Sequence, residues 1–427
     1  MKTLMITAPS SGTGKTLISI GLIRALKNRG MDVSAFKTGP DFIDTKYLSI
    51  ASGKRAGNLD IHMMGDGIKK ALSMNRGDYG VIEGAMGYFD GIYNTFENSS
   101  YDIGNKLGVN SILVYTPKGE MFSAIPKIKG MVDFKNSRIK GIILNKVTKS
   151  IYLLLKEQIE QYVGIRILGY LEKNKDLEIE SIYLGLKPIE DKDIENIMDK
   201  TAQRIEKTID LDGLISMMSS IDMAKYDYPN RRNIRVAIAY DKAFWFYYNE
   251  NLSLLENICH VEYFSPMKDK KVPNCDFIYI GGGYPELYKE ELSQNTEMIN
   301  SIIEKAKAGV YIYGEGGGFM YLSDSIDNYP MCGILKGKTI MENGLERFGY
   351  IDIKLNENSL LGQRGDMLKG QEFHRSTIDT KDKPIFSISK PKSNRKWQCG
   401  YRYKNVLGAY PHIHFLGNNK AFCNLLN

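Results

Sequence analysis

Residues 8–16 read Ala-Pro-Ser-Ser-Gly-Thr-Gly-Lys-Thr, after a short apolar run at residues 3–8 and before an amphipathic segment at residues 17–28. Small residues let backbone N–H groups surround phosphate oxygens, and the following helix adds the positive end of its dipole. In such a loop the lysine reaches the outer phosphates and the next hydroxyl can bind Mg²⁺. Lys15 and Thr16 hold these positions. The stretch therefore predicts a P-loop between a strand and a helix, although Pro9 replaces the usual first glycine.

The chain alternates short apolar runs with longer amphipathic segments, which is typical of a mostly parallel sheet covered by helices. In the first half, the runs rich in Ile, Val and Tyr are residues 33–37, 79–83, 111–115 and 139–145. A polar stretch at residues 222–233 precedes a fresh strand pattern at residues 234–239. We therefore predict an α/β fold with two domains: a P-loop NTPase-like parallel sheet over residues 1–228, and a second α/β domain over residues 232–427.

Composition excludes several classes of protein. Of the 427 residues, 43% are hydrophobic and 25% are charged, which is ordinary for a globular chain and unlike a disordered one. The five cysteines are far apart and lack metal-ligand spacing, so structural zinc and a disulfide framework are not expected. The net charge of +7 is scattered and the aromatic residues are not interleaved with Lys or Arg, so we expect no nucleic-acid partner.

The apolar runs are short throughout. None approaches the roughly 18 apolar residues that a membrane span requires. The run at the N-terminus stops at Pro9, too early for an export signal. We therefore expect a cytoplasmic protein with no membrane partner.

Two segments place charged residues where an open α/β sheet binds its ligand. One predicted strand ends in Glu83, and a glycine-rich loop that carries Asp90 follows it. Another predicted strand ends in Lys37, with Asp41 and Asp44 in the turn beyond it. Ligands of such sheets bind at the carboxyl ends of the strands, and an acid at a strand end can hold the metal of a P-loop enzyme. The pattern predicts a ligand site built from these groups and the P-loop.

These segments resemble the cobyrinic acid a,c-diamide synthase family, and the resemblance covers almost the whole chain. The motifs that carry it are APSSGTGKT (8–16), KTGPDFID (37–44), NLD (58–60), EGAMGYFDG (83–91), GIILNKV (141–147), AFWFYYNENL (243–252), FSPMKD (264–269), YIGGGYPELY (279–288), GQEFHRS (370–376) and YPHIHF (410–415). In that family the first domain is similar to dethiobiotin synthetase. The second is similar to a class I glutamine amidotransferase, which is flavodoxin-like.

The resemblance implies an ATP- and Mg²⁺-dependent ligase of cobalamin biosynthesis. Such an enzyme converts the a and c side-chain carboxylates of a tetrapyrrole, cobyrinate, into carboxamides through acyl phosphates. The nitrogen comes from glutamine or free ammonia. The implied partners are therefore a tetrapyrrole and a nitrogen donor, and a homodimer is a possible assembly.

The resemblance also implies roles for individual residues. Lys37 would neutralise the transferring phosphoryl group or the substrate carboxylate, and Asp90 would position the substrate. Asn145 would lie near the nucleotide base. The metal would be held by Thr16 and Glu83 together with Asp44 or Asp41. The implied triphosphate-binding residues are Ser11, Gly12, Thr13, Gly14, Lys15 and Thr16.

The second half departs from the family at one position. The family attacks glutamine with a cysteine thiolate in an Ala-Glu-Cys-Gly-Gly turn, and a histidine carries the proton. Here residues 313–318 read Tyr-Gly-Glu-Gly-Gly-Gly, so Gly316 stands at the nucleophile position and cannot form a thioester. The histidine is present as His412, and the glycines at 281–283 could still build an oxyanion site.

Three explanations of Gly316 stay open. The domain has lost its glutaminase activity and the synthetase takes ammonia, free or from a partner; or the cysteine has been replaced in this particular sequence; or the second domain has changed function. Residues 181–186 also differ, since they read Ser-Ile-Tyr-Leu-Gly-Leu where the family tends to carry Ser-Arg-His-Leu-Gly-Leu. That difference leaves nickel-sirohydrochlorin as an alternative substrate.

A rival hypothesis comes from another class of protein. In a nucleotide-switched binding protein, ATP hydrolysis drives docking and the amidotransferase domain is inactive. Such a switch has no reason to keep the GGGYPE loop at residues 281–286 or the YPHIHF end at residues 410–415. The amide synthase is therefore the favoured interpretation.

Overall fold

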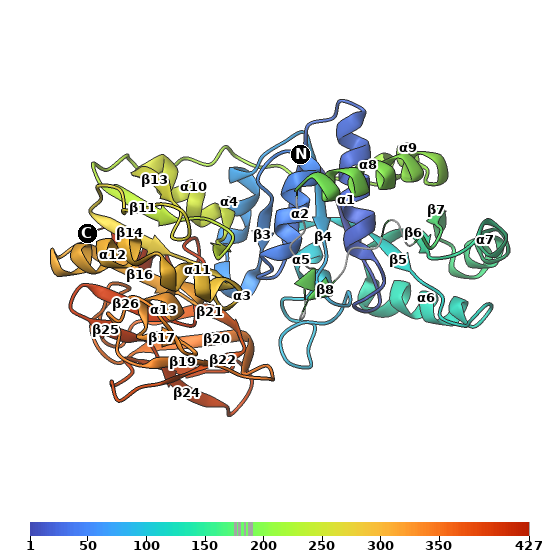
Figure 1. The fold of residues 1–427 in the computed structure, drawn as a ribbon. Coiled ribbons are helices and arrows are strands. Elements are labelled where there is room, and N and C mark those ends of the chain that lie inside the picture. Colours follow the sequence, from blue (N-terminus) through green and yellow to red (C-terminus); the bar gives the residue numbers. More distant parts are fainter. Residues whose placement is uncertain (175–176, 178–180, 183–184, 187–190, 427) are drawn as a thin grey trace. The chain divides into compact units, whose positions relative to one another are not determined.

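The computed structural model describes residues 1–174, 177, 181–182, 185–186 and 191–426 (Figure 1). The chain forms two compact units. The first contains Met1–Ile61 and Ile68–Tyr226, and the second contains His62–Gly67 and Asp227–Asn427. We predicted one boundary, at residues 228–232. No sequence pattern indicated that residues 62–67 would pack with the second unit.

The first unit is built on one eight-stranded sheet whose main path has the order β3-β2-β4-β1-β5-β6-β7. The strands of that path are parallel, and the short strand β10 pairs with β1 in the antiparallel sense. Their bounds are β1 Lys2–Thr7, β2 Val33–Thr38, β3 Gly57–Leu59, β4 Tyr79–Glu83, β5 Asn110–Tyr115, β6 Ile139–Asn145, β7 Arg166–Leu171 and β10 Ser219–Ser220. The strands are almost wholly buried, which explains why they read as continuous apolar runs and not as alternating patterns.

Helices follow the strands in the alternation that the sequence predicted. The helix α1 comes directly after the P-loop and packs against α2 and α8, which explains its almost continuous burial. The side chains of Ser99 and Thr148 cap α5 and α7. The helix bounds are α1 Lys15–Asn28, α2 Ile43–Ser52, α3 Ile61–Met64, α4 Gly67–Met74, α5 Ser100–Leu107, α6 Ala124–Asp133, α7 Lys149–Val163, α8 Asp191–Thr208 and α9 Leu211–Ser216. Between α7 and α8 lie β8, Ser181–Ile182, and β9, Gly185–Leu186.

The second unit has a six-stranded sheet in the order β13-β11-β14-β16-β26-β25, parallel except for β25. Its strands are β11 Arg235–Ala239, β13 His260–Phe264, β14 Phe277–Ile280, β16 Tyr311–Glu315, β25 Tyr401–Tyr403 and β26 Val406–Ala409. Its helices are α10 Asn249–Ile258, α11 Lys289–Gln294, α12 Thr296–Lys307, α13 Gly317–Leu322 and α14 Asn419–Leu425. This is the second α/β domain that the sequence predicted.

The second unit also contains antiparallel structure that the sequence reading did not separate from the parallel sheet. A five-stranded antiparallel sheet has the order β24-β23-β20-β21-β27. The strands β18-β17-β19-β22 form a smaller mixed sheet, in which β17 and β19 are parallel. The strands of the larger sheet are β20 Arg347–Leu355, β21 Met367–His374, β23 Phe386–Ser389, β24 Lys396–Cys399 and β27 His412–Ile413. Those of the smaller are β17 Ser325–Ile326, β18 Tyr329–Pro330, β19 Lys338–Met341 and β22 Ser376–Asp379. Two further strands pair with each other, β12 Phe244–Phe246 and β15 Gly282–Gly283.

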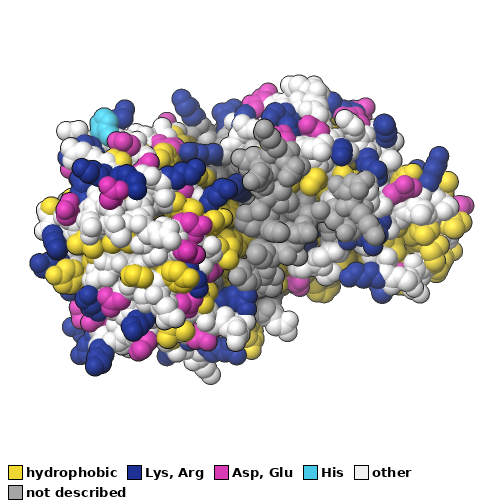
Figure 2. Space-filling view, in the orientation of Figure 1, with side chains coloured by type: hydrophobic (Ala, Val, Ile, Leu, Met, Phe, Trp, Pro, Cys, Tyr) yellow, Lys and Arg dark blue, Asp and Glu magenta, His cyan; other side chains and the backbone are white. Residues whose placement is uncertain are grey.

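Charged side chains of both signs are mixed on the described part of the face that Figure 2 shows, with apolar side chains between them. Within the described part of the chain, no helix combines the length and the apolar character that crossing a membrane would demand.

Candidate functional site

The P-loop lies between the carboxyl end of β1 and the start of α1. Its backbone turns at Gly14, which has φ +85° and directly precedes the first residue of the helix. An added Cβ at Gly14 would lie 2.3 Å from Nδ2 of Asn145. That same Nδ2 atom donates a hydrogen bond of 2.8 Å to the carbonyl of Thr13. Asn145, at the end of β6, therefore packs on the loop and contacts its backbone directly.

Lys15 is folded back over the loop. Its Nζ atom donates to the carbonyls of Ser10, at 3.2 Å, and Met86, at 2.5 Å. The side chain is buried, and burial together with the nearby charge of Lys37 lowers its pKa to about 8. The ammonium group is thus held by main-chain acceptors, which a phosphate oxygen can replace.

Lys37, Asp44 and Glu83 form one ion-pair cluster beside the P-loop. Lys37 Nζ lies 2.6 Å from Oδ2 of Asp44 and 2.9 Å from Oε1 of Glu83. The pairing of β2 with β4 places Lys37 directly opposite Glu83. The Thr16 hydroxyl completes the group, since it donates to Glu83 Oε1 at 2.6 Å and lies 3.5 Å from Asp44 Oδ2. The structure brings together the four residues for which the sequence implied a shared site.

Burial sets the electrostatics of this cluster. The side chains of Lys37 and Glu83 are 4% and 1% exposed. Burial raises the pKa of Glu83 above its ordinary value, against the opposing effect of Lys37. Burial alone would lower the pKa of Lys37, but the charges of Asp44 and Glu83 outweigh it and raise that pKa. Lys37 is therefore a fixed positive charge at the carboxyl edge of the sheet.

Asp41 and Asp90 have structural contacts of their own. Oδ1 of Asp41 accepts hydrogen bonds of 2.9 Å from the amides of Ile43 and Asp44, so it organises the first turn of α2. Burial and the charge of Asp44 raise the pKa of Asp41 to about 7. Oδ2 of Asp90 accepts from the amide of Gly87 at 2.9 Å and braces the loop after β4. Asp90 itself is exposed, which leaves it accessible to a substrate.

The residues present fit a magnesium ion. Thr16, Asp44 and Glu83 present oxygen atoms to one another, and Oε2 of Glu83 is buried without a hydrogen-bond partner among the described residues. In the described part of the chain, no group of three or more His, Cys, Asp or Glu side chains is placed so that it could hold a metal by itself. Two carboxylates and a hydroxyl suit Mg²⁺, which usually binds through one or two carboxylates, substrate phosphates and water.

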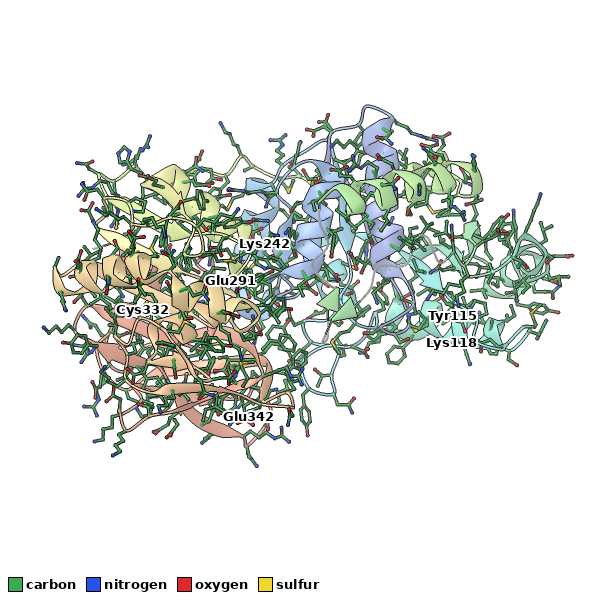
Figure 3. The ribbon with its side chains drawn as sticks, in the orientation of Figure 1. Tyr115, Lys118, Lys242, Glu291, Cys332 and Glu342 are labelled. Carbon is green, nitrogen blue, oxygen red and sulfur yellow. The ribbon has the colours of Figure 1, made fainter. Side chains whose placement is uncertain are left out.

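Several contacts at this site were not predicted because main-chain atoms make them. The carbonyls of Ser10 and Met86 hold Lys15, and no side-chain pattern marks a carbonyl. Thr116 was also missed; its hydroxyl donates to the carbonyl of Thr13 at 3.1 Å. Thr116 directly follows Tyr115, which is labelled in Figure 3 together with Lys118. Its position just beyond the end of a strand was the only feature of the sequence that pointed to it.

In the second unit, Gly316 forms a sharp turn between β16 and α13. Its backbone has φ +52° and ψ −110°. An added Cβ would lie 2.6 Å from Nε2 of His412 and 2.9 Å from its Cε1. An added Cβ at Gly282 would lie 2.5 Å from the same Cε1. The imidazole thus lies against the turn, with the GGG loop beside it, as the resemblance implied.

Glu315 supports this arrangement and was not singled out from the sequence. Its carboxylate accepts hydrogen bonds from the hydroxyls of Tyr279, at 2.7 Å, and Tyr313, at 2.9 Å. The amide of Ile413 donates to it at 3.2 Å, and Nδ1 of His412 lies 3.5 Å away. Burial and the charge of Glu315 raise the pKa of both tyrosines. The carboxylate therefore holds the strand that carries His412.

Residues 181–186, which suggested a different substrate, lie partly outside the described residues, since 183 and 184 are not described.

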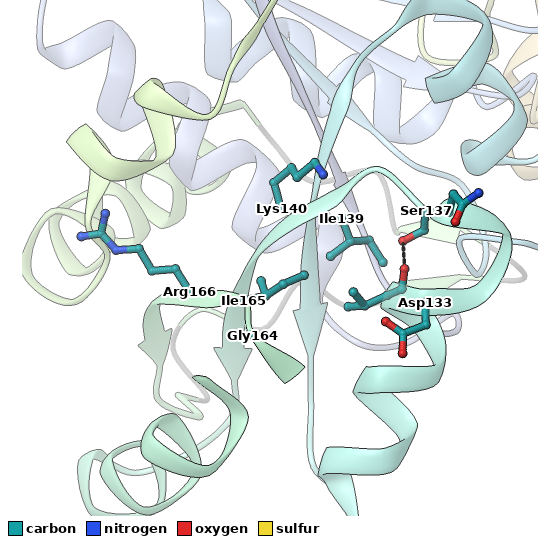
Figure 4. A pocket seen from close by; sticks show the side chains of 9 residues that line it. Asp133, Ser137, Ile139, Lys140, Gly164, Ile165 and Arg166 are labelled. Atoms are coloured by element: carbon teal, nitrogen blue, oxygen red, sulfur yellow. Dashed lines mark hydrogen bonds between the residues drawn. The ribbon is translucent and has the colours of Figure 1, made fainter. Parts of the chain in front are cut away.

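A separate pocket of about 680 Å³ in the first unit lies near the amino ends of β6 and β7 (Figure 4). It is lined by residues such as Ile139, Lys140 and Arg166. The P-loop follows the carboxyl end of β1, so this pocket is at the opposite edge of the sheet from the charged cluster.

Comparison with known proteins identifies both units. The CobQ/CobB/MinD/ParA nucleotide binding domain matches residues 4–182, and the CobB/CobQ-like glutamine amidotransferase domain matches residues 235–420. The cobyrinate a,c-diamide synthase of Clostridium acetobutylicum is 40% identical over 428 residues, covering 98% of each chain. The chain belongs to this family. The synthase of Methanocaldococcus jannaschii, 37% identical over 100% of this chain and 99% of its own, supports the same assignment.

The family resemblance carried by the motifs and the α/β fold predicted from the alternating segments are thereby confirmed. So is a nucleotide-binding first unit. Among solved structures, PurLQS from Thermotoga maritima covers 46% of this chain and 99% of its own, at 17% identity and a TM-score of 0.36. MinD from Aquifex aeolicus covers 52% and 100%, at 13% identity and a TM-score of 0.32. The family assignment does not depend on these two.

Proposed function

We propose that the chain is an ATP-dependent amide synthase that converts the a and c side-chain carboxylates of cobyrinate into carboxamides. The observation that carries this proposal is the cluster of Lys37, Asp44, Glu83 and Thr16 beside a P-loop lysine, in a chain 40% identical to a cobyrinate a,c-diamide synthase. A carboxylate is a poor acyl donor because its negative charge is delocalised over both oxygens. The enzyme must therefore convert it into a better one.

The first step forms an acyl phosphate. A substrate carboxylate oxygen attacks the γ-phosphorus of ATP, the bond from that phosphorus to the β–γ bridging oxygen breaks, and ADP leaves. Lys15 and the amino end of α1 hold the phosphates, and Lys37 offsets the negative charge that gathers as two anions approach. Positioning and electrostatic stabilisation account for most catalysis of this kind.

We propose that Thr16, Asp44 and Glu83 hold the Mg²⁺ ion. The ion, when bound, neutralises phosphate charge during transfer. The protein supplies the geometry: β4 ends at Glu83, the P-loop delivers Thr16, and the first turn of α2 delivers Asp44. Lys37 keeps the two carboxylates from repelling each other. Asp41, through its amide contacts, keeps Asp44 in place as a positioning residue.

The second step installs nitrogen. Ammonia attacks the acyl carbon, the bond from that carbon to the phosphate oxygen breaks, and phosphate departs with one proton from the nitrogen. Because Gly316 has no side chain, the second unit cannot release this ammonia through a thioester, and His412 fills the space beside the turn. We propose that the nitrogen enters as free ammonia.

The experiment is a coupled measurement of ADP and product mass. The protein is incubated with ATP, Mg²⁺ and ammonium, separately with cobyrinate, nickel-sirohydrochlorin and other tetrapyrrole acids. We expect one ADP for each amide formed, and the acid that is converted identifies the substrate. Lys15→Ala should abolish conversion. Lys140→Ala, which removes an exposed lysine from the opposite edge of the sheet, should not.

The outcomes separate the two hypotheses. ATP hydrolysis without amide formation from any acid would favour the nucleotide-switched binding protein. Conversion by Lys15→Ala at the unmodified rate would remove the P-loop from the mechanism.

A further inference from the structure

The antiparallel sheet of the second unit contains a small pocket that the proposed chemistry does not use. Its volume is about 330 Å³, and it is lined by residues of β20, β21, β24 and the segment before β24. This volume is at the lower end of the range for small-molecule sites, roughly 300–1,000 Å³. The pocket therefore suits a compact metabolite.

The buried acid in the pocket is Glu372, on β21. Its side chain is 1% exposed, and neither carboxylate oxygen has a hydrogen-bond partner among the described residues. Nε2 of His374 lies 3.8 Å from one of them, beyond hydrogen-bond distance. Burying a carboxylate without donors is costly. A buried acceptor of this kind calls for a donor outside the described residues, which a water molecule or a ligand can supply.

The fold leaves space for such a donor. Glu372 pairs across the sheet with Gly349 of β20, and directly opposed residues share one face. An added Cβ at Gly349 would meet only the end of the Lys390 side chain, at 3.4 Å. Because Gly349 has no side chain, the face beside the carboxylate stays open.

Cations complete the lining. Arg347, Lys390 and Arg395 all line the pocket. Lys390 donates to the carbonyl of Phe348, and Arg347 lies over the ring of Trp397, 5.2 Å from its centroid. Burial and the charge of Arg395 lower the pKa of Lys390, and the negative charge of Glu372 opposes them without restoring the ordinary value. Arg347 is ion-paired with Glu346, which also lines the pocket. With Lys396 the lining still holds more cations than carboxylates, and a bound anionic group would offset that excess.

We propose that this pocket binds a free α-amino acid as its zwitterion. The ammonium group donates to Glu372, and the carboxylate is held by Arg347, Lys390 and Arg395. An α-amino acid carries both charges on one carbon. A simple carboxylate would leave Glu372 without donors, and a simple amine would leave the excess positive charge of the lining unneutralised. The inference does not depend on the amide-forming activity of the first unit.

The test uses the full chain and its own fluorescence. Trp397 lines the pocket and is one of two tryptophans in the protein. Glycine and glutamine are titrated by calorimetry and tryptophan fluorescence, with propionate and methylamine as probes that carry one charge each. We expect saturable binding of the amino acids at one site. The single-charge probes should bind at least about ten-fold more weakly, because each forfeits charge-assisted hydrogen bonds.

Variants locate the site. Glu372→Gln should weaken amino-acid binding at least about ten-fold. Glu342→Gln, which removes an exposed carboxylate elsewhere in the second unit (Figure 3), should leave the affinity unchanged. Arg395→Ala alters an exposed side chain, so its folding is not at risk, and it should weaken binding as Glu372→Gln does.

Three results would each overturn the proposal. The first is no saturable binding of either amino acid. The second is propionate binding as tightly as glycine, which would show an anion site that ignores Glu372. The third is unchanged amino-acid affinity in Arg395→Ala.

Discussion

Replacing Gly316 by alanine should destabilise the second unit because two constraints act on one position. The backbone there has φ +52° and ψ −110°, which residues with a Cβ adopt only under strain. The new methyl group would lie 2.6 Å from Nε2 of His412, so the imidazole must move. That ring lies within 3.5 Å of Glu315 and against Gly282. The displacement therefore disturbs packed and charged neighbours.

The two effects can be separated. Backbone strain costs about 1–3 kcal/mol, and forcing an extra carbon into a packed site adds about 1–3 kcal/mol. Gly309→Ala is the matched control: its φ is +89°, and nothing lies within 4 Å of an added Cβ. It should show only the strain, about 1–2 kcal/mol. In a His412→Ala background, Gly316→Ala should lose the second contribution.

Urea unfolding followed by tryptophan fluorescence measures these free energies. Both tryptophans, Trp245 and Trp397, belong to the second unit, so the signal reports that unit alone. Two results would refute this prediction: a free-energy cost of Gly316→Ala no greater than that of Gly309→Ala, or a cost that stays the same when the His412 ring is removed. The same geometry predicts that Gly316→Cys regains glutaminase activity only if His412 rotates away from the turn.

Further predictions concern the charged cluster of the first unit. Nucleotide affinity should fall as pH rises through about 8, because Lys15 loses its proton there in the free protein. Calorimetric titrations with ATP on both sides of that pH measure this, and an affinity that does not change with pH would contradict it. Glu83→Gln should lower the rate of amide formation by about two orders of magnitude or more, and an unaltered rate in the folded variant would exclude Glu83 from the reaction. The pKa of Asp41 is raised from 3.8 to about 7, so ionising it costs more in the folded protein and stability falls as pH rises between these values. Asp41→Asn keeps the oxygen that organises α2 but cannot ionise. The melting temperature of the variant should therefore exceed that of the unmodified protein at pH 8 and equal it at pH 4; a difference that is the same at both pH values would refute this.

Much of the candidate site could be predicted because parallel strands end at one edge of a sheet. Lys37 and Glu83 each end an apolar run, and the structure pairs them directly across β2 and β4. The P-loop needs no long-range information, since its residues are consecutive. These parts of the site follow from local pattern and one topological rule.

The rest depends on contacts that no pattern marks. The carbonyl of Met86 holds Lys15, and every residue has a carbonyl. Glu315 is held by hydrogen bonds from the hydroxyls of Tyr279 and Tyr313. Tyr279 is distant in the sequence, and Tyr313 lies two residues before Glu315 on the same strand. The packing of residues 62–67 with the second unit joins segments that are distant in the sequence. Tertiary contacts of this kind join residues that are distant in the sequence, so local sequence patterns do not predict them.

The central claim is that ATP activates a tetrapyrrole carboxylate and that free ammonia displaces the phosphate. The direct measurement compares ammonium with glutamine as nitrogen source, in the presence of ATP, Mg²⁺ and cobyrinate, with ADP and product mass recorded together. The account predicts amide formation with one ADP per amide when ammonium is supplied, and none above background with glutamine alone. Amide formation from glutamine at the rate seen with ammonium, or no amide with either donor, would contradict it.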